Sequence, residues 1–107
     1  MAKGLGSGEL RIGIAGLGTV GVGVLRLLTE NQAEISARTG GALRVTAVSA
    51  RDATRDRGVD LSALAFEADA AALAVRHDVD VLVEVIGGTS GAGADAVIAA
   101  LRAGKAV

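Results

Sequence analysis

A glycine-rich turn joins a short apolar segment to a long segment of helical period near the start of the chain. Residues 10–16 read LRIGIAG and predict a strand that ends in glycine. Over residues 19–38 the apolar side chains recur at the spacing of one helix face, which predicts a single helix. Gly16, Gly18 and Gly21 lie at the junction in the pattern G-x-G-x-x-G. A strand, this turn and a helix in direct succession are the context that the dinucleotide-binding fingerprint requires.

Each glycine has its own physical role in such a turn. Gly16 permits the tight exit from the strand, Gly18 leaves the backbone open to a pyrophosphate, and Gly21 lets the helix pack close to the strand. The free amides and partial positive charge at a helix start favour the phosphates. A chain with 16 glycines also produces this spacing by chance, so a turn that serves chain geometry alone is the alternative. A P-loop is excluded, because no Gly-Lys-Ser/Thr follows.

The rest of the chain alternates strands with helices. The patterns predict strands at 42–50 and 79–88, helices at 69–77 and 94–103, and the first residues of a further strand at 105–107. Residues 51–60 predict a charged loop, and residues 61–66 are ambiguous, with a turn of helix and a very short strand expected within them. Helices between successive strands require parallel pairing. The predicted fold is α/β, an open parallel sheet with helices on both faces.

Composition limits the kind of protein. The 107 residues allow one domain, predicted at 10–107 behind a flexible leader at 1–9. A net charge of −1 and a single aromatic residue argue against nucleic-acid or anionic-membrane binding. Without cysteine there is no disulfide or thiolate metal site, and no residue cluster has metal-ligand spacing. The first ten residues lack the apolar segment of a secretory signal, so we expect a cytoplasmic protein.

The end of the second predicted strand bears on the choice of cofactor. NAD-preferring domains usually place an acid there to bind the ribose 2′-hydroxyl, but Ser49 and Ala50 stand at this point and Arg51 comes next. A guanidinium can pair with a 2′-phosphate, with Arg55 and Arg57 in support. The prediction is NADP or NAD, with NADP slightly favoured. The alternative is that Arg51 belongs to a solvated loop pair with Asp52.

The predicted strand 79–88 carries one carboxylate and ends in two glycines. Ligands of open parallel sheets sit beyond the carboxyl ends of the strands, so we expect Gly87 and Gly88 near the nicotinamide end of the cofactor. Glu84 interrupts the apolar strand and must be paired or hydrogen-bonded if it is buried. A structural role near the strand end and a role in organising the crevice both stay open for it.

Three segments together resemble the N-terminal domain of homoserine dehydrogenase: GIAGLGTVGVGV, DVLVEVIGG and AALRAGKAV. The resemblance spans residues 10–107. It implies a Rossmann-like fold, incomplete at the C-terminus of this chain, with the catalytic and dimerisation domain absent. It also implies an oxidoreductase that interconverts L-homoserine and L-aspartate 4-semialdehyde with NAD(P) in threonine and methionine biosynthesis. An amino-acid substrate and a homo-oligomer are implied for the full enzyme.

The resemblance also assigns roles to individual residues. It implies that the pyrophosphate turn is formed by Gly16, Gly18, Thr19, Val20 and Gly21. It implies that Arg51 stands at the basic position of NADP-using members. It also implies a loop near the nicotinamide, formed by Gly87, Gly88 and Thr89. The sequence departs from the family where Ser90, Gly91 and Ala92 stand in place of a proline that many members have. The family continues beyond AGKAV into an Asn-Lys segment that reaches the active site. No catalytic residue is therefore assigned, and we expect the fragment alone to be inactive.

Two other functions fit the same turn. One is a non-catalytic NAD(P)-binding module. The other is the cofactor domain of another semialdehyde or dihydrodipicolinate-type reductase. The double glycine after VEVI favours homoserine dehydrogenase over the second.

Overall fold

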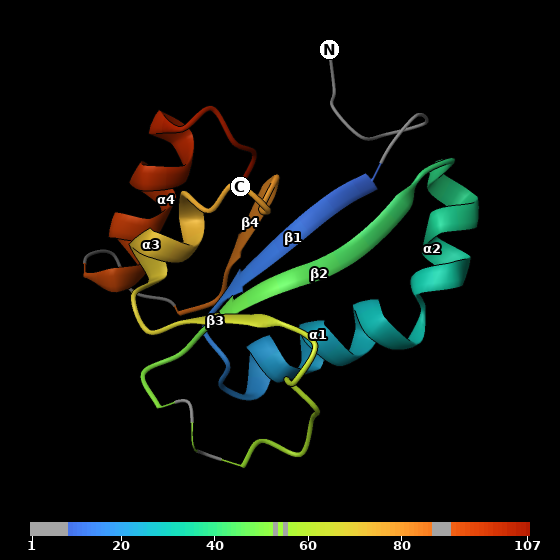
Figure 1. Cartoon of the computed structure of the whole chain (residues 1–107), viewed down its shortest axis with the longest axis horizontal. Coiled ribbons are helices and arrows are strands. Elements are labelled where there is room, and N and C mark those ends of the chain that lie inside the picture. Colours follow the sequence, from blue (N-terminus) through green and yellow to red (C-terminus); the bar gives the residue numbers. More distant parts are fainter. Residues whose placement is uncertain (1–8, 53, 55, 87–90) are drawn as a thin grey trace.

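The computed structural model describes residues 9–52, 54, 56–86 and 91–107. In this part the chain forms a central sheet between two layers of helices (Figure 1). Along the chain the elements are β1 (Glu9–Ala15), α1 (Thr19–Glu30), α2 (Gln32–Thr39), β2 (Ala42–Ser49), β3 (Ala65–Glu67), α3 (Ala70–Ala74), β4 (Val81–Glu84) and α4 (Ala92–Arg102).

The sheet has the strand order β3-β2-β1-β4, and every neighbouring pair is parallel. Ile14 in the first strand pairs with Val48 on one side and with Val83 on the other. The predicted open parallel sheet is therefore confirmed. Near the chain end, Ala106 forms a parallel bridge with Val81, as expected for the start of a further strand.

The helices cover both faces of the sheet, as predicted. On one face α3 and α4 pack against each other and against the sheet through small buried side chains. Alanine at buried positions such as Ala74, Ala96 and Ala100 lets the backbones approach closely. On the other face Leu25 of α1 packs on Ile14 and the neighbouring strand residues. Figure 1 shows α3 and α4 on one side of the strands and α1 and α2 on the other.

The predicted single helix at 19–38 is wrong, because it is broken at Asn31 into α1 and α2. The Asn31 side chain donates from Nδ2 to the carbonyl of Leu27 at 2.8 Å. The same carbonyl still accepts the backbone N–H of Asn31 at 3.1 Å, so the side chain adds a second donor where Asn31 departs from helical backbone angles, with φ −111° and ψ 14°. The segment after the break also buries no residue, so core packing does not hold it in line with α1.

Other element bounds differ from the expectations by a few residues. The ambiguous segment 61–66 contains a turn, closed by a bond from Leu64 N to Leu61 O, and then enters β3. The fourth strand ends at Glu84, so it is shorter than the predicted 79–88. None of the helices in the described part of the chain combines the length and the apolar character needed to cross a bilayer.

Candidate functional site

The six residues from Gly16 to Gly21 form the bend between β1 and α1. Gly16 follows the last residue of the strand, and Gly18 is the N-cap residue of the helix. Thr19 and Val20 are the first two helical residues, and both are exposed. The fingerprint therefore lies at the strand-to-helix junction that the sequence predicted.

Glycine is required at two points of this bend. Gly16 has a φ of +103°, and a Cβ there would lie 3.1 Å from the backbone nitrogen of Ile86. A Cβ on Gly21 would lie 1.8 Å from the carbonyl oxygen of Gly16, which is a severe overlap. The first turn of α1 thus rests directly on the end of β1.

Gly18 differs from the other two, because nothing lies within 4 Å of the position its Cβ would take. Protein packing therefore does not demand glycine here, and the space over the helix start is open. The first N–H groups of an α-helix have no partner within the helix and form its positive end. The first turn of α1 carries no acidic residue that would offset this charge. The bend fits a diphosphate, which would occupy the space that a side chain at Gly18 would fill.

A cavity of about 330 Å³ adjoins the bend at the carboxyl ends of the strands. The strand ends are held together there by bonds from Gly16 N to Ser49 O and from Val85 N to Ala15 O, both 2.9 Å long. Ligands of open parallel sheets bind at this edge. The cavity is lined by Gly16, Leu17, Gly18, Ser49, Ala50, Arg51, Asp52, Arg57, Ala68, Ala70, Val85, Ile86 and Ala92.

The charged residues of this lining come from the loop between β2 and β3. Arg51 is exposed and follows the end of β2 by two residues. Asp52 accepts hydrogen bonds on Oδ1 from the backbone nitrogen and the hydroxyl of Thr54, at 2.9 and 2.6 Å. Arg57 is half-buried and donates from Nε to the carbonyl of Leu17 at 3.2 Å. Two guanidinium groups and one carboxylate give the described lining a positive balance.

The structure shows a contact of Glu84 at the end of its strand. Its carboxylate accepts a hydrogen bond from the backbone nitrogen of Ile86 at 2.6 Å, which fixes the turn where the chain leaves β4. Ile86 in turn lies beside Gly16. The predicted residues Gly87, Gly88 and Thr89, and also Arg55, lie outside the described residues.

Several residues that line this cavity were not predicted from the sequence. Ala68 and Ala92 line it, although nothing in their side chains suggests binding. The available signal was position, because residues that follow β3 or begin α4 must lie at the same edge of a parallel sheet. The contact of Arg57 with the glycine turn was also missed, since it joins residues 40 positions apart.

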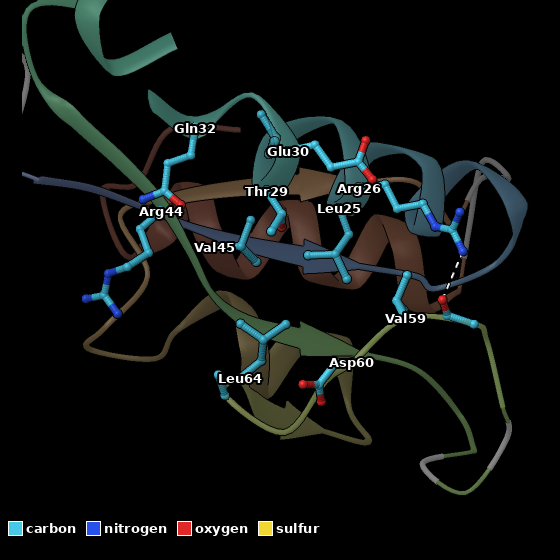
Figure 2. Close-up of a pocket in the computed structure, with 13 residues that line it drawn as sticks. Leu25, Arg26, Thr29, Glu30, Gln32, Arg44, Val45, Val59, Asp60 and Leu64 are labelled. Atoms are coloured by element: carbon cyan, nitrogen blue, oxygen red, sulfur yellow. Dashed lines mark hydrogen bonds between the residues drawn. The ribbon is translucent and has the colours of Figure 1, made fainter. Parts of the chain in front are cut away.

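A second cavity of about 680 Å³ lies between α1, β2 and the loop before β3 (Figure 2). Its floor is apolar and includes Leu25, Val45 and Leu64. Its rim carries two cations and two anions, Arg26, Arg44, Glu30 and Asp60, so its charge is balanced. No residue of the glycine turn lines it, and it therefore lacks the helix-start amides that favour phosphate.

Comparison with known proteins gives one consistent result. The family described as "Homoserine dehydrogenase, NAD binding domain" matches residues 16–107. The homoserine dehydrogenase of Corynebacterium glutamicum is 45% identical over 105 residues, which cover 98% of this chain and 23% of that protein. The homoserine dehydrogenase of Neisseria gonorrhoeae is 43% identical over 96 residues, covering 90% of this chain and 22% of that protein.

Solved structures agree. The homoserine dehydrogenase of Thiobacillus denitrificans superposes with a TM-score of 0.80 at 31% identity, over 94% of this chain and 23% of that one. The S. aureus homoserine dehydrogenase superposes with a TM-score of 0.79 at 29% identity. The match covers 91% of this chain and 24% of that one. The chain thus spans less than a quarter of the length of each curated relative named above. With most of its length matched by one family, the chain belongs to the NAD-binding domain family of homoserine dehydrogenases.

Proposed function

We propose that the Gly16–Gly21 bend binds the pyrophosphate of a nicotinamide dinucleotide. The observation that carries this proposal is the open space at Gly18 directly over the positive end of α1. A diphosphate in that space would accept hydrogen bonds from the amides of the first helical turn, including those of Thr19 and Val20. The backbone can approach the ligand closely because Gly18 has no side chain.

The adenosine end of the cofactor is proposed to lie toward Arg51. This residue lines the cavity just beyond the end of β2, where the ribose of a bound dinucleotide is expected. Ser49 and Ala50 offer no carboxylate for a 2′-hydroxyl, whereas the Arg51 guanidinium can pair with a 2′-phosphate. We therefore favour NADP over NAD. Placement of Gly87, Gly88 and Thr89 near the nicotinamide stays a prediction from the sequence.

For the longer protein to which this domain would belong, we propose NAD(P)-dependent interconversion of L-homoserine and L-aspartate 4-semialdehyde. When bound, the nicotinamide ring supplies or accepts the hydride. The residues of this chain contribute binding and orientation of the cofactor rather than proton transfer. An amino-acid substrate, a homo-oligomeric assembly and a cytoplasmic location are further predictions for that protein.

For this chain alone we propose cofactor binding without turnover. In the described part, the ionisable residues of the cavity are Arg51, Asp52 and Arg57. A guanidinium group has no acceptor atom for a substrate proton, and the Asp52 carboxylate accepts two hydrogen bonds from Thr54. Addition of L-homoserine and NADP to the chain should produce no reduced nicotinamide by absorbance. Sustained production of NADPH would contradict this proposal.

The binding proposal is tested by titrating the chain with NADPH and, separately, with NADH, using calorimetry and the fluorescence of the reduced nicotinamide. We expect saturable binding of one molecule per chain, with NADPH the tighter ligand. Adenosine 2′,5′-bisphosphate should compete with NADPH more strongly than AMP does. Lack of binding by both dinucleotides would overturn the assignment of the bend.

A further inference from the structure

We infer that Arg57 is a positioning residue for the cofactor-binding bend, which it holds in shape through the carbonyl of Leu17. This inference rests on the proposed function, since it concerns the same pyrophosphate site. Arg57 lies in the loop between β2 and β3, away from the bend in the sequence. The inference therefore makes cofactor affinity depend on this loop as well as on the bend.

The contact joins two distant segments. The Arg57 Nε donates to the Leu17 carbonyl oxygen at 3.2 Å, and the two residues are 40 positions apart. Leu17 is 4% exposed, and its side chain packs in the core beneath α1. Leu17 is therefore held on both sides, by the core through its side chain and by the guanidinium through its carbonyl.

The position of Leu17 explains why this contact matters for binding. It stands between Gly16 and Gly18, and glycine is the residue type with the greatest backbone freedom. A peptide group that rotated here would direct a carbonyl oxygen, rather than an amide, toward the phosphate. A hydrogen bond from a charged donor opposes this rotation and offsets the partial negative charge of the oxygen. The Arg57 guanidinium also adds positive charge to the cavity that it lines.

The same loop offers a matched control. The residue after Arg57 is Gly58, whose carbonyl accepts a hydrogen bond from Arg26 Nη2 at 2.9 Å. Figure 2 shows this bond as a dashed line at the edge of the second cavity. Arg26 therefore tethers the same loop to α1, but it lines the second cavity and not the one beside the bend.

These contacts predict a specific pattern of affinities. Arg57→Ala should lower the affinity for NADPH and the affinity for NADH by a similar factor of about tenfold, because a charged hydrogen bond is lost. The factor should be similar because both dinucleotides contain the pyrophosphate. Arg57→Lys keeps the charge and one donor group, so it should recover part of the affinity. Arg26→Ala should bind both dinucleotides within about twofold of the unaltered chain, since exposed polar contacts contribute little.

The experiment measures dissociation constants for NADPH and NADH by calorimetry on the 107-residue chain and these variants, with the melting temperature of each. Should Arg57→Ala fail to fold, Arg57→Gln takes its place, because it keeps a donor group and loses the charge. Unchanged affinities in the folded Arg57 variants would overturn the inference. A loss confined to NADPH would overturn it too, by assigning Arg57 to the 2′-phosphate.

Two other outcomes are distinguishable. An equal loss in Arg26→Ala would show that general attachment of the loop, and not the Leu17 carbonyl, sets the affinity, and this would also overturn the inference. If the unaltered chain bound neither dinucleotide, the proposed function itself would fail. Normal binding by the unaltered chain together with normal binding by the Arg57 variants would reject the role of Arg57 alone.

Discussion

Gly21 in α1 lies so close to Gly16 at the end of β1 that a Cβ on Gly21 would stand 1.8 Å from the Gly16 carbonyl oxygen. This close approach brings the start of α1 to the end of the strand. It also directs the helix start at the cavity where the strands end. The third glycine of the fingerprint therefore serves the fold, and it serves ligand binding only through the position of the helix.

Replacement of Gly21 by alanine should destabilise the chain. The overlap is with backbone, so the helix must shift, and overpacking of this kind costs about 1–3 kcal/mol. Gly23→Ala is the matched control in the same helix, because nothing lies within 4 Å of its Cβ position. It should raise stability by about 0.5–1 kcal/mol, the usual gain in an exposed helix interior. Urea unfolding measures both, and equal stability of the two variants would contradict the packing described for Gly21.

Replacement of Gly18 by serine should separate stability from binding. Serine is at least as good an N-cap residue as glycine, and the structure has room for its side chain, so the free energy of unfolding should stay equal or rise by a few tenths of a kcal/mol. The same side chain would occupy the space assigned to the diphosphate. NADPH and NADH affinity should fall roughly 5- to 150-fold, the equivalent of about 1–3 kcal/mol of overpacking. A stable variant with normal affinity for both dinucleotides would place the ligand elsewhere.

Replacement of Arg51 by alanine should change the choice of cofactor. Loss of a charged hydrogen bond to the 2′-phosphate should lower the affinity for NADPH by roughly tenfold or more. NADH lacks that phosphate, so its affinity should change by less than about twofold. The ratio of the two dissociation constants is the measurement. An equal loss for both ligands would remove the reason for favouring NADP.

Asp78 should contribute to stability in a pH-dependent way. Its carboxylate bonds to the Arg76 guanidinium at 2.8 Å, and this bond lowers the pKa of Asp78 below its usual value. A carboxyl whose pKa is lower in the folded state stabilises the fold above its unfolded pKa. That contribution disappears as the pH falls through the folded pKa.

The variant Asp78→Asn tests this relation by urea unfolding near pH 7 and near pH 3, on either side of the usual carboxyl range. The variant should be less stable by about 0.5–1 kcal/mol at the higher pH, as for a partly exposed ion pair. The difference should shrink at the lower pH. Glu34→Gln is the control, because its pair with Arg38 is largely exposed and should contribute at most about 0.5 kcal/mol. A difference that grew on acidification would contradict the assigned sign.

The sheet and the glycine bend could be predicted because they depend on local patterns. Apolar strands of limited length and three glycines at fixed spacing are visible in the sequence, and the parallel order follows from the intervening helices. The break at Asn31 could not be predicted from the apolar stripe, since it lies in the backbone angles of this residue, whose side chain bonds to the Leu27 carbonyl. Local hydrogen bonds from a side chain to the backbone do not alter the spacing of apolar residues, so the spacing gives no sign of them.

The cavity beside the bend could be predicted only in part. Gly16, Gly18 and Arg51 were predicted to bind the cofactor, and all three line it. The contact between Arg57 and the Leu17 carbonyl depends on the path of the irregular loop between β2 and β3. Such a path is set by tertiary contacts and has no period in the sequence.

The most direct test of the central claim is the change in backbone amide chemical shifts of the ¹⁵N-labelled chain when NADPH is added. The account predicts that the largest changes fall on Gly18, Thr19, Val20 and Gly21, with a smaller group at Arg51. Changes centred on Leu25, Val45, Val59 and Leu64 around the larger cavity, with the Gly16–Gly21 amides unmoved, would contradict it.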